Sequence, residues 1–128
     1  MNTATNIARG LVGITGLIQI TTGLLFWMGY VLSLIPIHML SGLILSISLL
    51  VLAILGARAG VNRGFVTLAI VWSFLTPALG IMQTQLLPGS MHWLIRVIHL
   101  LVGLAAMSMG HRLALRIQSL QAPEPAAS

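Results

Sequence analysis

The stretch LIPIHMLSGLILSISLLVLAILGA, residues 34–57, runs for 24 residues without an arginine, a lysine or an acidic side chain. About 20 predominantly apolar residues form a helix that is long enough to cross the hydrocarbon core of a bilayer. Water cannot surround such a segment at low cost, because almost every side chain in it is apolar. The stretch therefore predicts a membrane-spanning helix.

Three further windows of this kind flank the first, so the predicted spans are 11–30, 34–57, 65–86 and 91–116. Only short turns connect them, and short links force consecutive helices to run antiparallel. Pro36 suits the first turn of a helix, and Ser90 is placed to cap the last helix. We therefore predict an all-α, four-helix, up-down-up-down transmembrane bundle over residues 1–120. Residues 121–128, with two prolines and the only acidic residue, predict a disordered tail.

The composition of the whole chain supports this fold class. The 128 residues suffice for one domain, and 58% of them are hydrophobic while 5% are charged. In ordinary soluble domains about a quarter of the residues are charged. The net charge of +5 comes from arginines that are dispersed at the ends of the spans, which argues against a nucleic-acid surface. The absence of cysteine excludes disulfides and iron–sulfur clusters.

The arginines also predict how the bundle is oriented. All but Arg96 fall at one end of the predicted bundle: Arg9, Arg58, Arg63, Arg112 and Arg116. Positively charged loops stay in the cytoplasm, so we expect both termini on the cytoplasmic side of the cell (inner) membrane. Trp27, Tyr30 and Trp93 then lie at the outer boundary, where aromatic rings are enriched. Trp72 falls near the middle of its span and has no such explanation.

Polar residues in the last span follow a helical pattern. His92, Arg96, His99, Gly103, Ala106 and Gly110 are separated by alternating steps of four and three residues. That spacing puts them on one stripe, which we expect to face the interior of the bundle. Small residues such as Ala106 and Gly110, and Gly16 in the first span, predict close helix packing.

The second and fourth spans share the pattern Ile-His-x-Leu-x-Gly-Leu, at residues 37–43 and 98–104. These two helices run in the same direction, so His38 and His99 should approach one space from different sides. Imidazole is a common metal ligand, and two histidines from facing helices are typical axial ligands of haem iron. Gly42 and Gly103, one turn deeper, would leave room for the edge of a flat macrocycle.

Arg96 strengthens the haem interpretation, because no acidic residue lies in any span to neutralise its charge. Arg96 and His92 lie roughly 4.5 and 10 Å outward of His99 along the helix, where haem propionates would reach. The depth of the histidines leaves an alternative open. His38 precedes Arg58 by 20 residues and His99 precedes Arg112 by 13, so His92 matches the depth of His38 and could be the second ligand instead.

With His38, His99 and the neighbouring arginine, the four-helix body resembles small membrane b-type cytochromes, such as the cytochrome b561-like proteins. The residues predict one haem b near the outer face, bound non-covalently because the chain has no cysteine to attach it. The resemblance implies one-electron transfer, with quinone or another redox partner. It implies an electron carrier rather than an enzyme, or a quinone-linked oxidoreductase if there is catalysis. Those families generally hold two haems with four histidines, whereas here the cytoplasmic half offers only His111.

Two other functions stay open. His38, His92 and His99 could bind copper together with methionines near the outer side, because thioethers are soft ligands. These methionines are Met28, Met39, Met82 and Met91. Alternatively, the chain is a cofactor-free membrane anchor or accessory subunit of a larger complex. The sequence also leaves open whether the chain forms a homo-oligomer.

Overall fold

The computed structural model describes residues 2–127, which form four long α-helices and one short 3-10 helix. The elements are α1 (Thr3–Trp27), η1 (Leu32–Leu34), α2 (Ile35–Ala59), α3 (Arg63–Met82) and α4 (His92–Gln121). No strand occurs within residues 2–127. All four α-helices are long and apolar enough to cross a membrane. The prediction of an all-α transmembrane four-helix bundle is confirmed.

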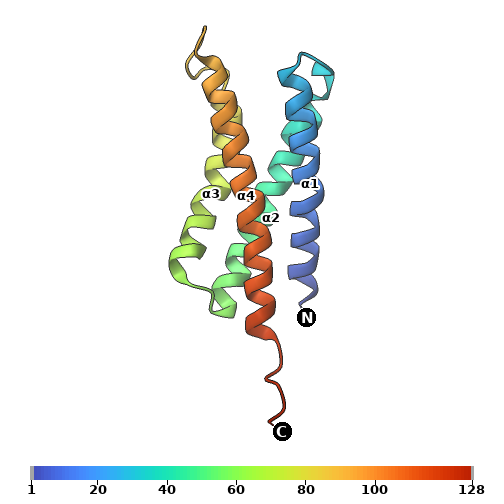
Figure 1. The fold of residues 1–128 in the computed structure, drawn as a ribbon, viewed down its shortest axis with the longest axis vertical. Helices are drawn as coiled ribbons and strands as arrows, with labels where there is room; N and C mark the ends of the chain where they lie inside the picture. The colour runs from blue at the N-terminus through green and yellow to red at the C-terminus, as the bar shows by residue number, and fades with distance from the viewer. Residues whose placement is uncertain (1, 128) are drawn as a thin grey trace.

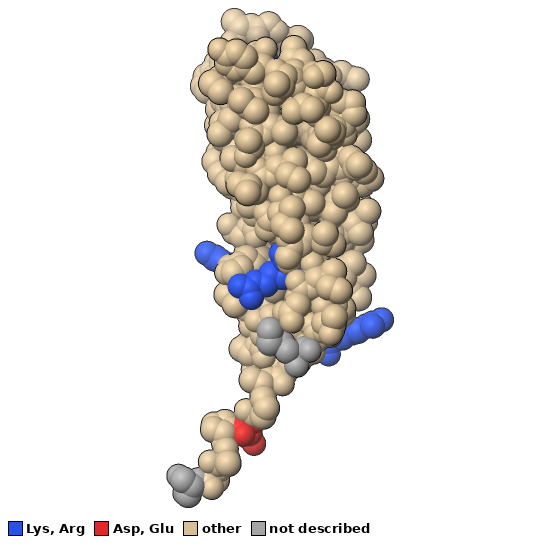
Figure 2. Space-filling view, turned by 90° about the vertical axis from the view of Figure 1, so that its right-hand side faces the viewer, with Lys and Arg blue, Asp and Glu red and all other residues tan. Residues whose placement is uncertain are grey.

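The helices alternate in direction, with α1 beside α2 and α3 beside α4 (Figure 1). The α1–α2 and α3–α4 connections form one end of the bundle, which we call the histidine end because His38 and His99 lie toward it. The two termini and the α2–α3 connection form the other end, which we call the arginine end. Blue arginine side chains gather toward the arginine end on the face shown in Figure 2. The two helix pairs diverge toward the histidine end (Figure 1).

The hydrophobic core fills the middle of the bundle and its arginine end. Leu49 and Leu52 of α2 pack there with Leu113 and Ile117 of α4, and all four side chains are fully buried. Among residues 2–127, Ile95 is the one buried hydrophobic residue outside this cluster. The half of the bundle around the histidines therefore has little hydrophobic core of its own.

Small residues permit close contacts between α1 and α4, as predicted. A Cβ atom at Gly16 would lie 2.5 Å from Met107 Cε, and one at Gly110 would lie 2.9 Å from Val12 Cγ1. Ala106 of α4 is also buried, with 1% of its surface exposed. Only small residues allow the helix backbones to approach this closely.

Trp72 of α3 forms a hydrogen bond between helices, which explains its position in the middle of a span. Its indole Nε1 donates to the backbone oxygen of Val102 in α4 at 3.0 Å. An indole N–H in an apolar environment needs an acceptor, so this contact fixes α3 against α4.

The helix ends differ in part from the predictions. Pro36 lies in the first turn of α2, as expected. Ser90 does not cap α4, because the helix begins one residue too late and the N–H groups of His92 and Leu94 bond to backbone oxygens instead. The helix α3 ends at Met82, before the predicted residue 86, and α4 continues to Gln121, beyond the predicted residue 116.

Candidate functional site

The structure brings His38 of α2 and His99 of α4 together toward the histidine end. Their ring centroids lie 6.4 Å apart, and the ring planes are inclined by 56°. The helices α2 and α4 pack against each other, and each contributes one imidazole to the pair. Phe26 of α1 contacts the His38 ring edge-on, with a centroid distance of 5.2 Å. Of the two candidate partners for His38, the structure thus places His99 beside it.

Thr22 of α1 is the hydrogen-bond partner of the His38 ring. Its Oγ1 atom lies 2.6 Å from His38 Nδ1 and donates its own proton to the backbone oxygen of Ile18, also at 2.6 Å. When the Thr22 hydroxyl donates its one proton to Ile18, the same hydroxyl accepts a hydrogen bond from His38 Nδ1. In that arrangement the Nδ1 atom of His38 carries the proton, and the lone pair on Nε2 is available to a ligand.

Gln19, one turn earlier in α1, holds the backbone at His38. Its amide Nε2 donates to the backbone oxygen of His38 and to Ser41 Oγ, the latter at 2.6 Å. A Cβ atom at Gly42 would lie 3.1 Å from Gln19 Oε1. The Gln19 side chain therefore occupies the space beside Gly42 that the sequence pattern predicts to be open.

His99 packs against the backbone of α3 at Gly80. A Cβ atom at Gly80 would lie 3.2 Å from His99 Cε1, so a larger residue there would push the ring away. The Nδ1 atom of His99 is buried and has no hydrogen-bond partner within residues 2–127. A buried polar atom without a partner is uncommon in folded proteins and calls for an explanation. Next to this ring, Gly103 faces open space, with no atom within 4 Å of an added Cβ.

Arg96 and His92 do not face the interior as the stripe predicts. At 3.6 residues per turn, Arg96 lies about 60° around the helix from His99. Ile95 takes the interior position and is 7% exposed, whereas Arg96 is exposed. His92 is half-buried, and its Nδ1 lies 3.2 Å from the backbone oxygen of Leu86, so it closes the α3–α4 connection.

The residues of the copper alternative are not assembled. Within residues 2–127, no group of three or more His, Cys, Asp or Glu side chains is placed to hold a metal ion. The methionines considered as soft ligands are exposed: Met28, Met39, Met82 and Met91. Methionines that point outward from a membrane bundle contact lipid rather than the histidine pair.

Three residues of this site were not identified from the sequence: Gln19, Thr22 and Gly80. A glutamine within an apolar span was the available indication for Gln19, because an uncharged polar side chain in lipid needs a partner on another helix. Thr22 and Gly80 are common residue types in membrane helices, so their roles become visible only when the helices are placed together.

Searches against protein-family models, curated proteins and solved structures find no match to this chain.

Proposed function

We propose that this chain is an integral membrane b-type haem protein that transfers single electrons. In this proposal His38 and His99 would hold one non-covalently bound haem. The observation that carries it is the spacing of the two rings. With a metal–imidazole bond of about 2 Å, two rings on opposite sides of one metal ion have centroids about 6 Å apart. The observed separation is 6.4 Å.

The hydrogen bonds of the two histidines support the same proposal. Histidines that bind metals usually donate their other ring N–H to an oxygen, and Thr22 accepts such a bond from His38. The Nδ1 atom of His99 has no hydrogen-bond partner within residues 2–127, so this ring lacks the oxygen contact that Thr22 makes with His38. A flat apolar group between the helices would also provide packing in the half of the bundle around the histidines. Among residues 2–127, Ile95 is the one buried hydrophobic residue outside the core cluster.

Each residue of the site has a distinct role in this proposal. A bound haem supplies the one-electron chemistry. His38 and His99 would hold it from α2 and α4, and the bond to Thr22 would keep His38 in the tautomer that binds a metal. Gln19 fixes the backbone beside His38. Arg96, exposed one turn from His99, is a cationic donor at the rim of the site and would pair with a propionate.

We further propose the orientation and the redox partner. The arginine end lies in the cytoplasm, because basic residues at the ends of spans are retained there, and both termini are then cytoplasmic. The histidine end faces the outer side of the cell membrane. A haem in that half exchanges electrons at the outer side, with a membrane quinone as the partner that can reach it from the bilayer.

The test is the visible absorption spectrum of the protein purified after expression with ample haem, before and after reduction with dithionite. We expect the sharp α and β bands of a low-spin haem with two axial ligands. His38→Ala and His99→Ala should each abolish this spectrum, whereas His92→Ala should keep it, because His92 bonds to the α3–α4 connection. A colourless protein would contradict the proposal and favour a cofactor-free anchor, and bound copper without haem would favour the metal alternative.

A further inference from the structure

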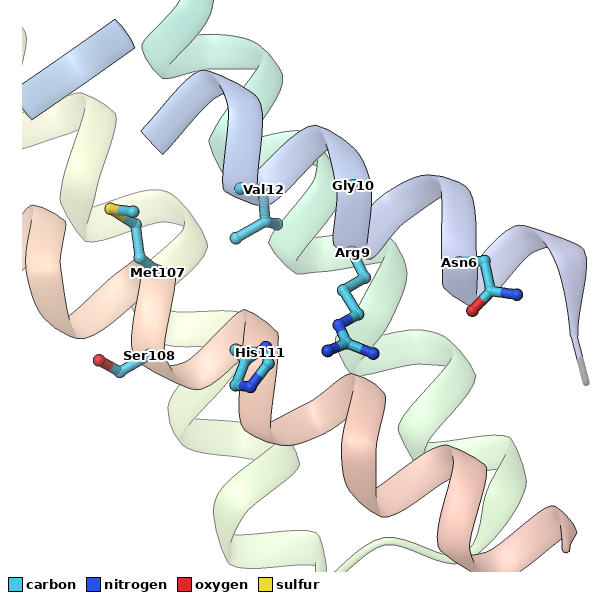
Figure 3. A pocket seen from close by; sticks show the side chains of 8 residues that line it. Asn6, Arg9, Gly10, Val12, Met107, Ser108 and His111 are labelled. Carbon is cyan, nitrogen blue, oxygen red and sulfur yellow. The ribbon is translucent and has the colours of Figure 1, made fainter. Parts of the chain in front are cut away.

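A groove lies between α1 and α4 near the arginine end, remote in the fold from the histidine pair. It has a volume of about 620 Å³, and Figure 3 shows the side chains around it. Arg9 and Gly10 of α1 line one side, and Ser108 and His111 of α4 line the other. The Arg9 side chain extends across the groove toward the His111 ring (Figure 3).

The groove is open because α1 has glycines where it borders α4. No atom lies within 4 Å of an added Cβ at Gly10 or at Gly13. By contrast, Val12 packs directly on Gly110 and forms part of the floor. At the end of the groove toward the termini, Gln118 Nε2 donates to Asn6 Oδ1 at 3.0 Å and joins the two helices.

The lining is cationic and polar at one end and apolar at the other. Arg9 and His111 lie toward the terminal end with Asn6, while Val12 and Met107 continue toward the middle of the bundle. The only acidic side chain of the protein is Glu124, in the segment that follows α4. The groove therefore presents positive charge that no carboxylate of α1 or α4 neutralises.

We propose that this groove binds an anionic phospholipid from the leaflet at the arginine end. Arg9 donates to the lipid phosphate, His111 and Ser108 contact the head group, and one acyl chain lies over Gly10 and Gly13 toward Met107. Basic pockets between transmembrane helices are suited to anionic head groups, and the surface of an anionic leaflet adds to the attraction. A guanidinium also matches the geometry of a phosphate better than an ammonium does. This site does not depend on the proposed haem.

The experiment is native mass spectrometry of the detergent-purified protein with phosphatidylglycerol or phosphatidylcholine added at equal concentration. We expect retention of phosphatidylglycerol to exceed that of phosphatidylcholine. Arg9→Gln should reduce the retained phosphatidylglycerol about ten-fold, because the variant loses one charge-assisted hydrogen bond to the lipid phosphate. The matched control is Arg63→Gln, an exposed arginine at the start of α3 outside the groove, which should retain the lipid.

A second variant tests the acyl chain separately from the charge. Gly13→Leu places a side chain in the groove at a position where an added Cβ meets no atom within 4 Å, so we expect the bundle to fold and lose the lipid. Equal retention of phosphatidylglycerol by the Arg9 and Arg63 variants would overturn the proposal. It would also be overturned if Gly13→Leu kept the lipid while inorganic phosphate displaced it, because the groove would then be a simple anion site.

Discussion

The substitution Thr22→Val tests the proposed haem site through a residue that does not itself contact a metal. Valine has nearly the shape of threonine but cannot accept a hydrogen bond. His38 Nδ1 would lose its acceptor at 2.6 Å, in a position where the Thr22 side chain is 7% exposed. Leaving a buried donor without a partner costs about 1–3 kcal/mol.

The expected effect on haem affinity follows from the same bond. Removing the hydrogen-bond partner of a metal-binding histidine typically lowers the affinity for the metal by about 10–100-fold. We expect the haem dissociation constant of Thr22→Val to rise within this range. The reduction potential should rise as well, because an imidazole without its hydrogen-bond acceptor is a weaker electron donor and stabilises oxidised iron less.

Titration of haem into protein purified without it, followed at the Soret band, measures the affinity. Thr21→Val is the matched control, since Thr21 is the same residue type on the exposed side of α1. Its dissociation constant should equal that of the unmodified protein. If the Thr22 and Thr21 variants bind haem equally well, Thr22 does not orient a ligand, and the reasoning from the tautomer of His38 fails.

Three further substitutions address other contacts. Gly80→Ala should displace the His99 ring, because its Cβ would lie 3.2 Å from Cε1, and should lower the low-spin fraction in the absorption spectrum; an unchanged fraction would contradict the contact. Trp72→Phe removes the bond to Val102 and should destabilise the bundle by about 0.5–1.5 kcal/mol in detergent melts, whereas an unchanged melting temperature would show that the bond contributes nothing. Arg96→Leu should lower the reduction potential in a redox titration, because loss of a nearby positive charge favours oxidised haem. Arg96→Lys should recover part of it, and a constant potential for both would mean that Arg96 only extends to the interface.

The sequence predicted the four apolar helices because lipid imposes one demand on every span, which is enough apolar residues in a row. It did not predict that α1 begins at Thr3, eight residues before the predicted residue 11. It also predicted that His38 and His99 approach each other, because the shared pattern lies on two helices that run in the same direction. The inward face of each helix was harder to predict. In a membrane, lipid-facing and interior side chains are both apolar, so hydrophobic periodicity carries little information about rotation. Arg96 belongs to the predicted stripe by its spacing, yet Ile95 takes the interior position and Arg96 is exposed.

The side-chain contacts at Gly42 and Gly80, which each depend on a second helix, could not be predicted. Gly42 has the right spacing to leave space beside His38, but Gln19 of α1 occupies that space. The same holds for Gly80, which supports a histidine of another helix. Such contacts depend on the distance between helix axes and on side-chain direction, neither of which is determined by residue spacing along one chain.

The unequal lengths of the helices limit the thickness of the bilayer that this protein can span. The 20 residues of α3 extend about 30 Å, which equals the usual thickness of the hydrocarbon core. The 30 residues of α4 extend about 45 Å and project beyond it. In a thicker bilayer, the polar ends of α3 at Asn62 and Gln83 would be drawn into hydrocarbon, while a thinner one would only uncover more of α4. The shortest helix therefore sets an upper limit on bilayer thickness, and long-chain lipids should destabilise the bundle before short-chain lipids do.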